Sequence, residues 1–385
     1  MKILYSAIDQ TVPGTKGGSV HVVAVAEGLA ALGHEVVALV TPGSSPAPKT
    51  GVRWIGMPPP LGSTHLRMVR RPQVARLAET LRPDVVIERY HNFGGEAITV
   101  ARSIGAIGVL EVNAPVVDYQ GSRKALLDRA LLAEPMRRWR ERLCRLADVI
   151  VTPAAEILPA GIPRQRITVL EWGADTERFR PRVAGSPPFT RPSVGTLAVF
   201  AGAFRSWHGT VHLVRAIKEL EMRGRHDVGA VLIGDGPERP RVQAEAAGSN
   251  RIVFTGPLPH DVMPAALAAA DVGVAPFDPS SHPPLMLGFY WSPLKIFEYM
   301  AAGLPVAAPA LDRIPTLIEQ GREGILYDPR DPRALAESLV QLTDPALRAR
   351  LGAAARDRAV RDYSWAAHCR ALEAAFLDAR QRRSA

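Results

Sequence analysis

Short apolar segments alternate with amphipathic segments along the whole chain, and this alternation constrains the fold more than any other feature. The predicted strands of the first half are Ile3–Ala7, Glu35–Val40, Asp84–Ile87, Ile107–Val112 and Val149–Thr152. Those of the second half are Leu197–Ala201, Ala230–Ile233, Ile252–Phe254, Val272–Ala275 and Pro305–Ala307. Helical patterns such as Val20–Leu32, Val211–Met222 and Pro264–Ala270 separate them. Such alternation predicts an α/β protein whose parallel sheets are covered by helices on both faces.

A proline-rich stretch at residues 182–192 separates two halves that repeat this pattern. The stretch has no hydrophobic periodicity, so we interpret it as a linker. A chain of 385 residues is long enough for roughly two to three domains. We therefore expect one domain at residues 1–182 and another at residues 193–360. Two doubly wound domains that face each other would bind a ligand in a cleft at the carboxyl ends of their strands.

Basic residues exceed acidic residues by nine, and part of this excess is local. Residues 120–147 contain eight arginines and lysines against three acidic residues. One interpretation is a solvated helix face. The alternatives are an acidic substrate or an anionic membrane surface. A nucleic-acid partner is disfavoured, because the segment lacks the interleaved aromatic residues of a single-strand binder.

The sequence gives few indications of a membrane-spanning helix, a signal peptide or a redox or metal site built from cysteines. No apolar run approaches the roughly 18 residues that a membrane-spanning helix needs. The apolar start of the chain is too short for a signal peptide. The two cysteines, Cys144 and Cys369, have neither metal nor redox spacing. We expect a cytoplasmic protein, and peripheral attachment to the inner face of the membrane stays open.

A short segment that begins at Ser292 has residues typical of a helix start at one end and of a helix stop at the other. Ser292 is the expected N-cap, Pro293 the first helical residue, and Gly303 the left-handed residue that ends the helix. The start of a helix attracts an anion, and Lys295 adds a positive charge there. Glu298 follows on the same face. This arrangement matches the phosphate and ribose of a nucleotide, and an ordinary amphipathic helix with a solvated Glu298 is the alternative.

Glycine loops follow the first predicted strand of each half. Gly17 and Gly18 come after a predicted loop at residues 9–15 and precede a helix. Paired glycines let the backbone approach a ligand closely, although the same pattern is common in ordinary packing. In the second half, Arg205 and His208 follow the strand, and both side chains could reach a diphosphate.

A partial dinucleotide fingerprint lies further along the second half. Gly234 and Gly236 supply its first two glycines, but Arg239 occupies the position of the third. The fingerprint is therefore a weak signal when it is taken alone.

Taken together, these segments resemble the glycosyltransferase family 4 group of the GT-B fold. The likeness covers nearly the whole chain and is strongest between Leu197 and Trp365. The matching segments are Gly17-Gly18 with residues 33–36, and residues 175–181, 234–237, 253–256, 270–276 and 293–303.

The resemblance implies a fold and an activity. The implied fold has two Rossmann-like, doubly wound domains that face each other across a cleft. It also has a C-terminal helix, here around Tyr363–Leu377 within residues 361–385, that crosses back to the first domain. The implied activity is transfer of a sugar from a nucleotide diphosphate sugar to a hydroxyl acceptor, with retention of configuration. It implies no required metal and no other cofactor. The acceptor would be a glycan, a glycolipid or a small natural product.

The chain departs from the family pattern on the donor side. Of the two glutamates that the family pairs, Glu298 matches the second, whereas Tyr290 stands at the first. The arginine that follows the loop glycine falls on Ala203, and the lysine before Gly209 falls on His208. Arg205 is a candidate to replace the lost positive charge.

A further departure concerns the first domain. The active-site histidine of the family falls on Asn113, which can bind a sugar hydroxyl but cannot carry a charge. His91 is a second candidate for a residue that faces the cleft.

These considerations assign two groups of site residues. The catalytic candidates are Asn113, His91, Arg205 and Lys295. The candidates for donor binding are Gly17, Gly18, His208, Gly234, Gly236, Tyr290, Ser292, Leu294 and Glu298. Two other functions stay open, namely a nucleotide-sugar epimerase on the same fold and a weakly catalytic nucleotide-sugar-binding protein that docks on a membrane.

Overall fold

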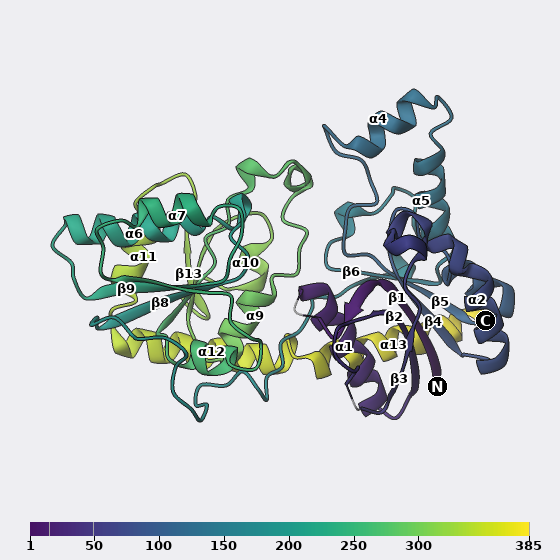
Figure 1. The fold of residues 1–385 in the computed structure, drawn as a ribbon, viewed down its shortest axis with the longest axis horizontal. Coiled ribbons are helices and arrows are strands. Elements are labelled where there is room, and N and C mark those ends of the chain that lie inside the picture. The colour runs from purple at the N-terminus through teal and green to yellow at the C-terminus, as the bar shows by residue number, and fades with distance from the viewer. Residues whose placement is uncertain (15, 49, 385) are drawn as a thin grey trace. The chain divides into compact units, whose positions relative to one another are not determined.

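A computed structural model describes residues 1–14, 16–48 and 50–384 of the chain. The chain forms two compact units (Figure 1). The first comprises Met1–Trp172, Tyr290–Ser292 and Trp365–Ala385, and the second comprises Gly173–Phe289 and Pro293–Ser364. The proline-rich stretch at residues 182–192 lies inside the second unit and carries neither helix nor strand.

The first unit is built on a seven-stranded sheet with the order β3-β2-β1-β4-β5-β6-β7. All neighbouring strands run parallel. The strands are β1 (Lys2–Val12), β2 (Glu35–Pro42), β3 (Val52–Gly56), β4 (Val85–Arg89), β5 (Ile107–Glu111), β6 (Val149–Thr152) and β7 (Ile167–Val169).

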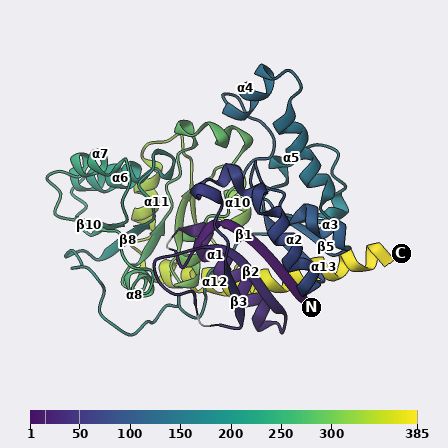
Figure 2. The ribbon, with the colours of Figure 1, turned by 45° about the vertical axis from the view of Figure 1, so that its right-hand side comes forward.

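Helices cover both faces of this first sheet (Figures 1 and 2). The helices of this unit are α1 (Gly17–Ala31), α2 (Arg71–Leu81), α3 (Ile98–Ile104), α4 (Arg123–Ala130), α5 (Pro135–Leu146) and α13 (Trp365–Ser384), of which α4 does not pack on the sheet. Side chains of β1 alternate between two cores. Ile3 and Tyr5 pack with α1 and α13, whereas Leu4 and Ile8 pack with α2. A strand that is buried on both faces reads as a continuous apolar run, as the sequence of β1 does.

The second unit repeats the topology with six parallel strands in the order β10-β9-β8-β11-β12-β13. The strands are β8 (Thr196–Ala201), β9 (Val228–Ile233), β10 (Ile252–Gly256), β11 (Val272–Val274), β12 (Val306–Pro309) and β13 (Gly324–Tyr327). In both units the chain winds outward from the first strand in one direction and then in the other. This winding is the doubly wound, Rossmann-like arrangement.

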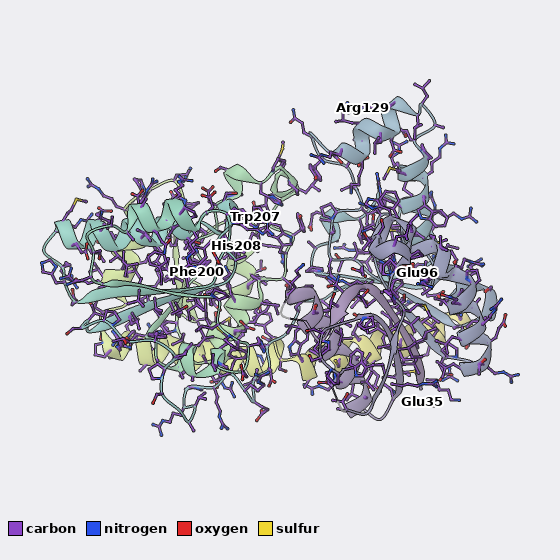
Figure 3. The ribbon with its side chains drawn as sticks, viewed as in Figure 1. Glu35, Glu96, Arg129, Phe200, Trp207 and His208 are labelled. Atoms are coloured by element: carbon purple, nitrogen blue, oxygen red, sulfur yellow. The ribbon has the colours of Figure 1, made fainter. Side chains whose placement is uncertain are left out.

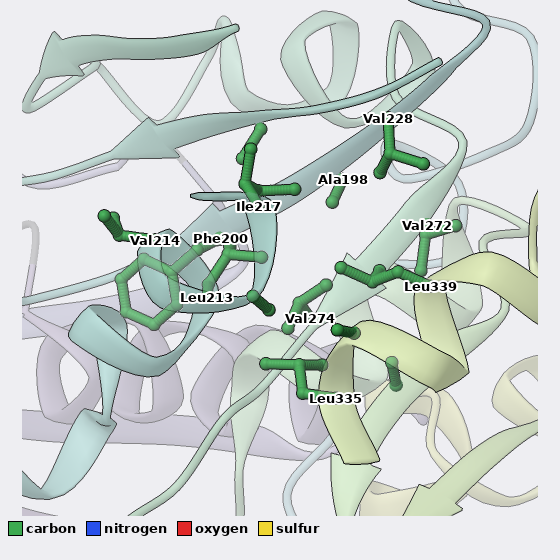
Figure 4. Close-up of a cluster of buried hydrophobic side chains, with 14 of the residues drawn as sticks. Ala198, Phe200, Leu213, Val214, Ile217, Val228, Val272, Val274, Leu335 and Leu339 are labelled. Atoms are coloured by element: carbon green, nitrogen blue, oxygen red, sulfur yellow. The ribbon is translucent and has the colours of Figure 1, made fainter. Parts of the chain in front are cut away.

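The helices of the second unit are α6 (Thr210–Met222), α7 (Arg239–Glu245), α8 (Met263–Ala268), α9 (Leu294–Ala301), α10 (Ile314–Leu317), α11 (Ala334–Gln341) and α12 (Pro345–Asp362). Side chains of α6 and α11 meet those of the sheet in one apolar core, which contains Phe200, Leu213, Ile217 and Leu339 (Figure 4). Among the described residues of both units, no helix combines the length and the apolar character needed to cross a membrane.

The predicted fold class is confirmed, and all ten predicted strands are present within a few residues of their predicted bounds. Three edge strands, β3, β7 and β13, were not predicted, because they are short and only partly buried. The prediction of a loop at residues 9–15 is wrong for residues 9–12, which continue β1, and Thr15 lies outside the described residues.

One hydrogen bond fastens α9 to the central strand of the second sheet. The backbone N–H of Ala201, at the end of β8, donates to the Tyr299 hydroxyl at 2.7 Å. The Tyr299 ring is fully buried and rests on Gly273 of β11. A Cβ at Gly273 would lie 2.5 Å from two ring atoms, a separation that real Cβ atoms do not adopt. The absence of a side chain at Gly273 therefore sets the position of α9.

We predict that Gly273→Ala destabilises the second unit by about 1–3 kcal/mol, because the new methyl group overpacks the Tyr299 ring. Gly195→Ala is the matched control. A Cβ there meets only the Asp227 carbonyl, at 3.6 Å. We expect that control to change the free energy of unfolding by no more than about 0.5 kcal/mol. Calorimetric unfolding of the whole chain measures both. Equal stability of the two variants would contradict this account of α9.

Candidate functional site

The strand order of each sheet reverses beside its first strand, between β1 and β4 in the first unit and between β8 and β11 in the second. In doubly wound sheets, ligands bind outside the carboxyl ends of the strands at this reversal. Most of the predicted site residues follow these strands. The second unit holds the predicted anion-binding helix.

The start of α9 differs from its prediction. The helix begins at Leu294, and Pro293 occupies the N-cap position without a capping side chain. The prediction of Ser292 as N-cap is wrong, because its hydroxyl is held elsewhere. Ser292 donates to the Glu171 carboxylate at 2.7 Å and accepts from the Trp172 N–H at 2.6 Å. The end of the helix is as predicted, since Gly303 is left-handed with φ of +74°.

Lys295 is a half-buried side chain whose amine end is fully buried. Its Nζ atom is buried and has no hydrogen-bond partner among the described residues. Aromatic faces form its surroundings, with the Phe200 ring centre at 4.1 Å and the Phe277 ring centre at 5.3 Å. Burial lowers the pKa of Lys295 to about 7, although the charge of Glu298 acts to raise it. The amine can therefore take up a proton, and an anion that binds beside Nζ would favour the protonated form.

Glu298 follows Lys295 on α9 and has a mostly buried side chain, which is 16% exposed. One of its carboxylate oxygens lies 3.8 Å from Nε2 of His260. That nitrogen is also buried without a hydrogen-bond partner in the described part of the chain. A carboxylate and an imidazole nitrogen with free hydrogen-bonding capacity suit a ligand that carries hydroxyl groups.

Gly202, the residue after β8, lets the backbone pass close to Lys295. A Cβ at Gly202 would lie 3.1 Å from Lys295 Nζ. The predicted donor residues Gly234 and Gly236 support this loop from the other side. A Cβ at Gly234 would lie 2.0 Å from the Gly202 carbonyl, and one at Gly236 would lie 2.6 Å from the Phe204 carbonyl. Gly234 and Gly236 therefore pack two loops together at the strand ends.

His208 is placed near Phe200 and Trp207 at one edge of the second unit (Figure 3). Burial, with the charge of Lys295 as the next cause, lowers the pKa of His208 to about 3. Because its Nδ1 is bonded to the Ala203 carbonyl, that nitrogen carries the hydrogen and Nε2 is an acceptor. A neutral His208 cannot replace the positive charge of the family's lysine, and its contact with a diphosphate stays a prediction.

Arg205 is exposed, and its guanidinium lies 5.3 Å from the centre of the Trp207 ring. It lines a cavity of about 220 Å³ together with Ser206, Glu238 and Arg241. Lys295 and Glu298 do not line this cavity. Arg205 thus lies over the Trp207 ring, close to His208 in the sequence, and forms no ion pair with the described residues.

In the first unit, Gly17 and Gly18 form the first turn of α1, which starts earlier than predicted. A Cβ at Gly18 would lie 2.2 Å from the Gln10 side chain and 3.4 Å from an Arg89 nitrogen. Arg89 ends β4 and is 12% exposed, with Asp9 and Glu111 each 3.8 Å from its guanidinium. The first glycine loop thus lies beside a cation that the sequence analysis did not single out.

Asn113 and His91 follow β5 and β4. The Asn113 amide oxygen accepts from Trp172 Nε1 at 2.9 Å, whereas its amide nitrogen is buried without a partner in the described residues. Asn113 therefore keeps a free donor. Burial, followed by the charge of Arg67, lowers the pKa of His91, so its imidazole is neutral at pH 7. Its Nδ1 accepts from the Phe93 N–H at 3.3 Å.

Tyr290 belongs to the first unit and is almost fully buried, with its ring 5.1 Å from that of Trp291. Burial raises the pKa of Tyr290. The hydroxyl therefore stays protonated and neutral, so it can donate and accept hydrogen bonds but cannot carry the negative charge of the glutamate that the family has at this position.

A buried polar cluster of His21, Glu111 and His368 lies behind Arg89 in the first unit. Burial alone would raise the pKa of Glu111, but His21, Arg89 and the Tyr5 hydroxyl lower it to about 2. His21 is hydrogen-bonded directly to this carboxylate, and Tyr5 donates to it at 2.8 Å. His368 binds the Glu171 carbonyl at 2.7 Å. We interpret the cluster as a hydrogen-bonded network, since the direct contact between His21 and Glu111 leaves no space for an ion between them.

Family models match both units of the chain. The model for Glycosyltransferase Family 4 matches residues 15–178, and the model for Glycosyl transferases group 1 matches residues 195–344.

Curated relatives are more distant. The chain is 28% identical over 228 residues to D-inositol 3-phosphate glycosyltransferase of Corynebacterium efficiens, a match that covers 56% of this chain and 51% of the relative. It is 34% identical over 177 residues to 2-deoxystreptamine glucosyltransferase of Streptomyces kanamyceticus, which covers 45% of this chain and 42% of the relative. The chain thus spans about half the length of the curated relatives that it matches.

Solved structures resemble the chain over its full length. Sucrose-phosphate synthase from Thermosynechococcus elongatus superposes with a TM-score of 0.70 at 20% identity, and the match covers 100% of both chains. HepE of Anabaena, in complex with UDP-glucose, superposes with a TM-score of 0.66 at 17% identity, again over 100% of both chains. At these identities the likeness establishes the fold alone. Together with the family models that match both of its units, it shows that the chain belongs to glycosyltransferase family 4 and has the GT-B fold.

Proposed function

We propose that the protein is a retaining glycosyltransferase that moves a sugar from a nucleotide diphosphate sugar to a hydroxyl acceptor. The observation that carries this proposal is the buried, unpartnered Lys295 amine in the first turn of α9, one turn before Glu298. Burying an amine without a partner is unfavourable unless a ligand completes the site. The anion that suits this position is a diphosphate.

Each donor-binding residue of the second unit has a proposed role. The free N–H groups at the start of α9, from Leu294 onward, and Lys295 hold the diphosphate. Glu298 accepts hydrogen bonds from the ribose hydroxyls. Gly202 keeps the loop after β8 clear of the phosphates, and Gly234 and Gly236 brace that loop. Arg205 supplies the positive charge that the family has at the position of Ala203.

The first unit is proposed to bind the sugar and the acceptor. The free amide donor of Asn113 suits a sugar hydroxyl. Tyr290 and Ser292 are proposed to line the sugar, and Gly17 and Gly18 leave room for a phosphate or a hydroxyl beside Arg89. The neutral His91 imidazole can exchange hydrogen bonds with an acceptor.

The proposed reaction is a front-face transfer. The bond between the anomeric carbon and the diphosphate oxygen breaks, and the acceptor hydroxyl forms its new bond on the same face of the sugar. A diphosphate oxygen takes the acceptor's proton, so no protein base is required. Lys295, Arg205 and the helix dipole stabilise the charge that develops on the leaving diphosphate.

The names of the curated relatives point to a class of acceptor that can be tested first. Those names contain two cyclitols, D-inositol 3-phosphate and 2-deoxystreptamine. A cyclitol hydroxyl is therefore the first acceptor class that we propose to test. A nucleotide-sugar epimerase would instead convert its substrate with no acceptor present, and a weakly catalytic binding protein would bind the donor without turnover.

We predict that Glu298→Ala weakens binding of the matching nucleoside diphosphate about tenfold to a hundredfold, because a charged hydrogen bond contributes roughly 1.5–3 kcal/mol. The matching nucleotide is first identified by thermal shift with a panel of nucleoside diphosphates. Calorimetric titration then compares the variant with wild type and with Glu319→Ala, a control whose carboxylate is 60% exposed in the same unit. A dissociation constant that is unchanged in Glu298→Ala would exclude the ribose role.

We also predict that the product keeps the anomeric configuration of the donor and that turnover continues in the presence of a chelator. The reason for the second expectation is that Lys295, Arg205 and the start of α9 together can balance the diphosphate charge. Proton NMR of the product early in the reaction reports the configuration. An inverted product, or activity that a chelator abolishes and magnesium restores, would refute this mechanism.

A further inference from the structure

The first unit exposes a group of leucines on α4 and on the turn that follows it. Four leucine side chains within seven residues are more than half exposed, namely Leu126 at 58%, Leu127 at 54%, Leu131 at 59% and Leu132 at 92%. Figures 1 and 2 both show α4 standing away from the sheet of its unit, with α5 as its neighbour. Exposed apolar side chains that gather on one segment are typical of an interaction site.

The carboxylates of this segment do not face solvent freely. Asp128 is buried and accepts from the backbone N–H groups of Met136 and Arg137, both at 2.9 Å, so that it caps the start of α5. Glu134, at the end of the turn, forms an ion pair with Arg137. What residues 123–133 expose is therefore leucine, alanine and arginine.

Two exposed arginines flank the leucines. Arg123 is the first residue of α4, and Arg129 is its last residue but one (Figure 3). Lys124 is different, because its Nζ donates to the Pro115 carbonyl at 2.9 Å. We use the term α4 surface for Arg123, Leu126, Leu127, Arg129, Leu131 and Leu132.

The arginines of α5 are less available than their number suggests. Arg140 is 1% exposed and binds Asp118 at 3.0 Å. Arg137 and Arg145 form ion pairs with Glu134 and Glu141. Trp139 donates from its indole to the Gly94 carbonyl at 2.9 Å. Arg138 and Arg142 of α5 are exposed, but no large apolar side chain of α5 is, so exposed basic and apolar side chains occur together on α4 and not on α5.

We propose that the α4 surface docks the protein on an anionic lipid membrane. Leucines beside arginines, without a free carboxylate, are complementary to the acyl boundary and to the negative headgroups of such a bilayer. The arginines attract the surface and the leucines enter the interface, so binding depends on both. This inference rests on α4 alone and is independent of the proposed sugar transfer.

Co-sedimentation of the full chain with vesicles tests the proposal. Vesicles contain phosphatidylglycerol and phosphatidylcholine, or phosphatidylcholine alone, at low salt. We expect binding to the anionic vesicles, weak binding to the neutral ones, and a loss on adding salt. The quadruple variant L126Q/L127Q/L131Q/L132Q and the double variant R123E/R129E should each lower the partition coefficient at least about tenfold. Circular dichroism confirms that the variants fold.

Two controls match the variants outside the α4 surface. Met222→Gln removes an apolar side chain that is 82% exposed in the second unit, and Arg164→Glu reverses an exposed charge in the first. Both should bind as wild type does. No binding to anionic vesicles would overturn the proposal, and so would equal binding to neutral vesicles. Dimers in light scattering that the leucine variant dissociates, without any lipid binding, would assign the surface to a second copy of the chain and would also overturn it.

Discussion

The Lys295 amine is buried and has no hydrogen-bond partner among the described residues, and the proposed donor site depends on this constraint. Desolvating an ammonium group is expensive, and the aromatic faces of Phe200 and Phe277 return only part of the lost hydration. The fold maintains this position because α9 is fastened to β8 through Tyr299 and rests on Gly273. The packing of Tyr299 thus fixes the start of α9 at a place where the Lys295 amine has no anionic partner among the described residues.

Arg67 in the first unit is a buried cation that, unlike Lys295, has carboxylate partners. Arg67 is completely buried, but its guanidinium binds Glu96 through two nitrogens at 2.6 Å and 3.0 Å and Asp9 through the third at 3.2 Å. A fully paired cation of this kind fixes structure. Lys295 lacks such carboxylate contacts, and Asn113 keeps a free amide donor. Unmet hydrogen-bonding capacity among the described residues therefore distinguishes Lys295 and Asn113 from the fully paired Arg67.

The fold was largely predictable from the sequence, since strands buried on both faces read as apolar runs between helical patterns. The end of α9 was also predictable, because Gly303 adopts the left-handed conformation that its position requires. The role of Ser292 was not predictable, since Glu171 and Trp172 compete for its hydroxyl from more than a hundred residues away. Three further features were not predictable from the sequence, namely the aromatic surroundings of Lys295, the neutral state of His208 and the position of Arg89. Each depends on residues that only the folded chain brings together.

The central claim is that a nucleoside diphosphate completes the site at Lys295, and proton uptake tests it most directly. The pKa of Lys295 is lowered to about 7 in the free protein, so at pH 8 the amine is mostly neutral there, whereas a bound anion raises its pKa. Binding is thus unimpeded below pH 7 and weakens as the pH rises above it. Calorimetric titration at pH 8, in buffers of different ionisation enthalpy, should show uptake of about one proton per bound nucleotide. Lys295→Arg, which is always charged, should bind without this uptake. Uptake that is equal in wild type and Lys295→Arg, or nucleotide binding without uptake in either, would contradict the account.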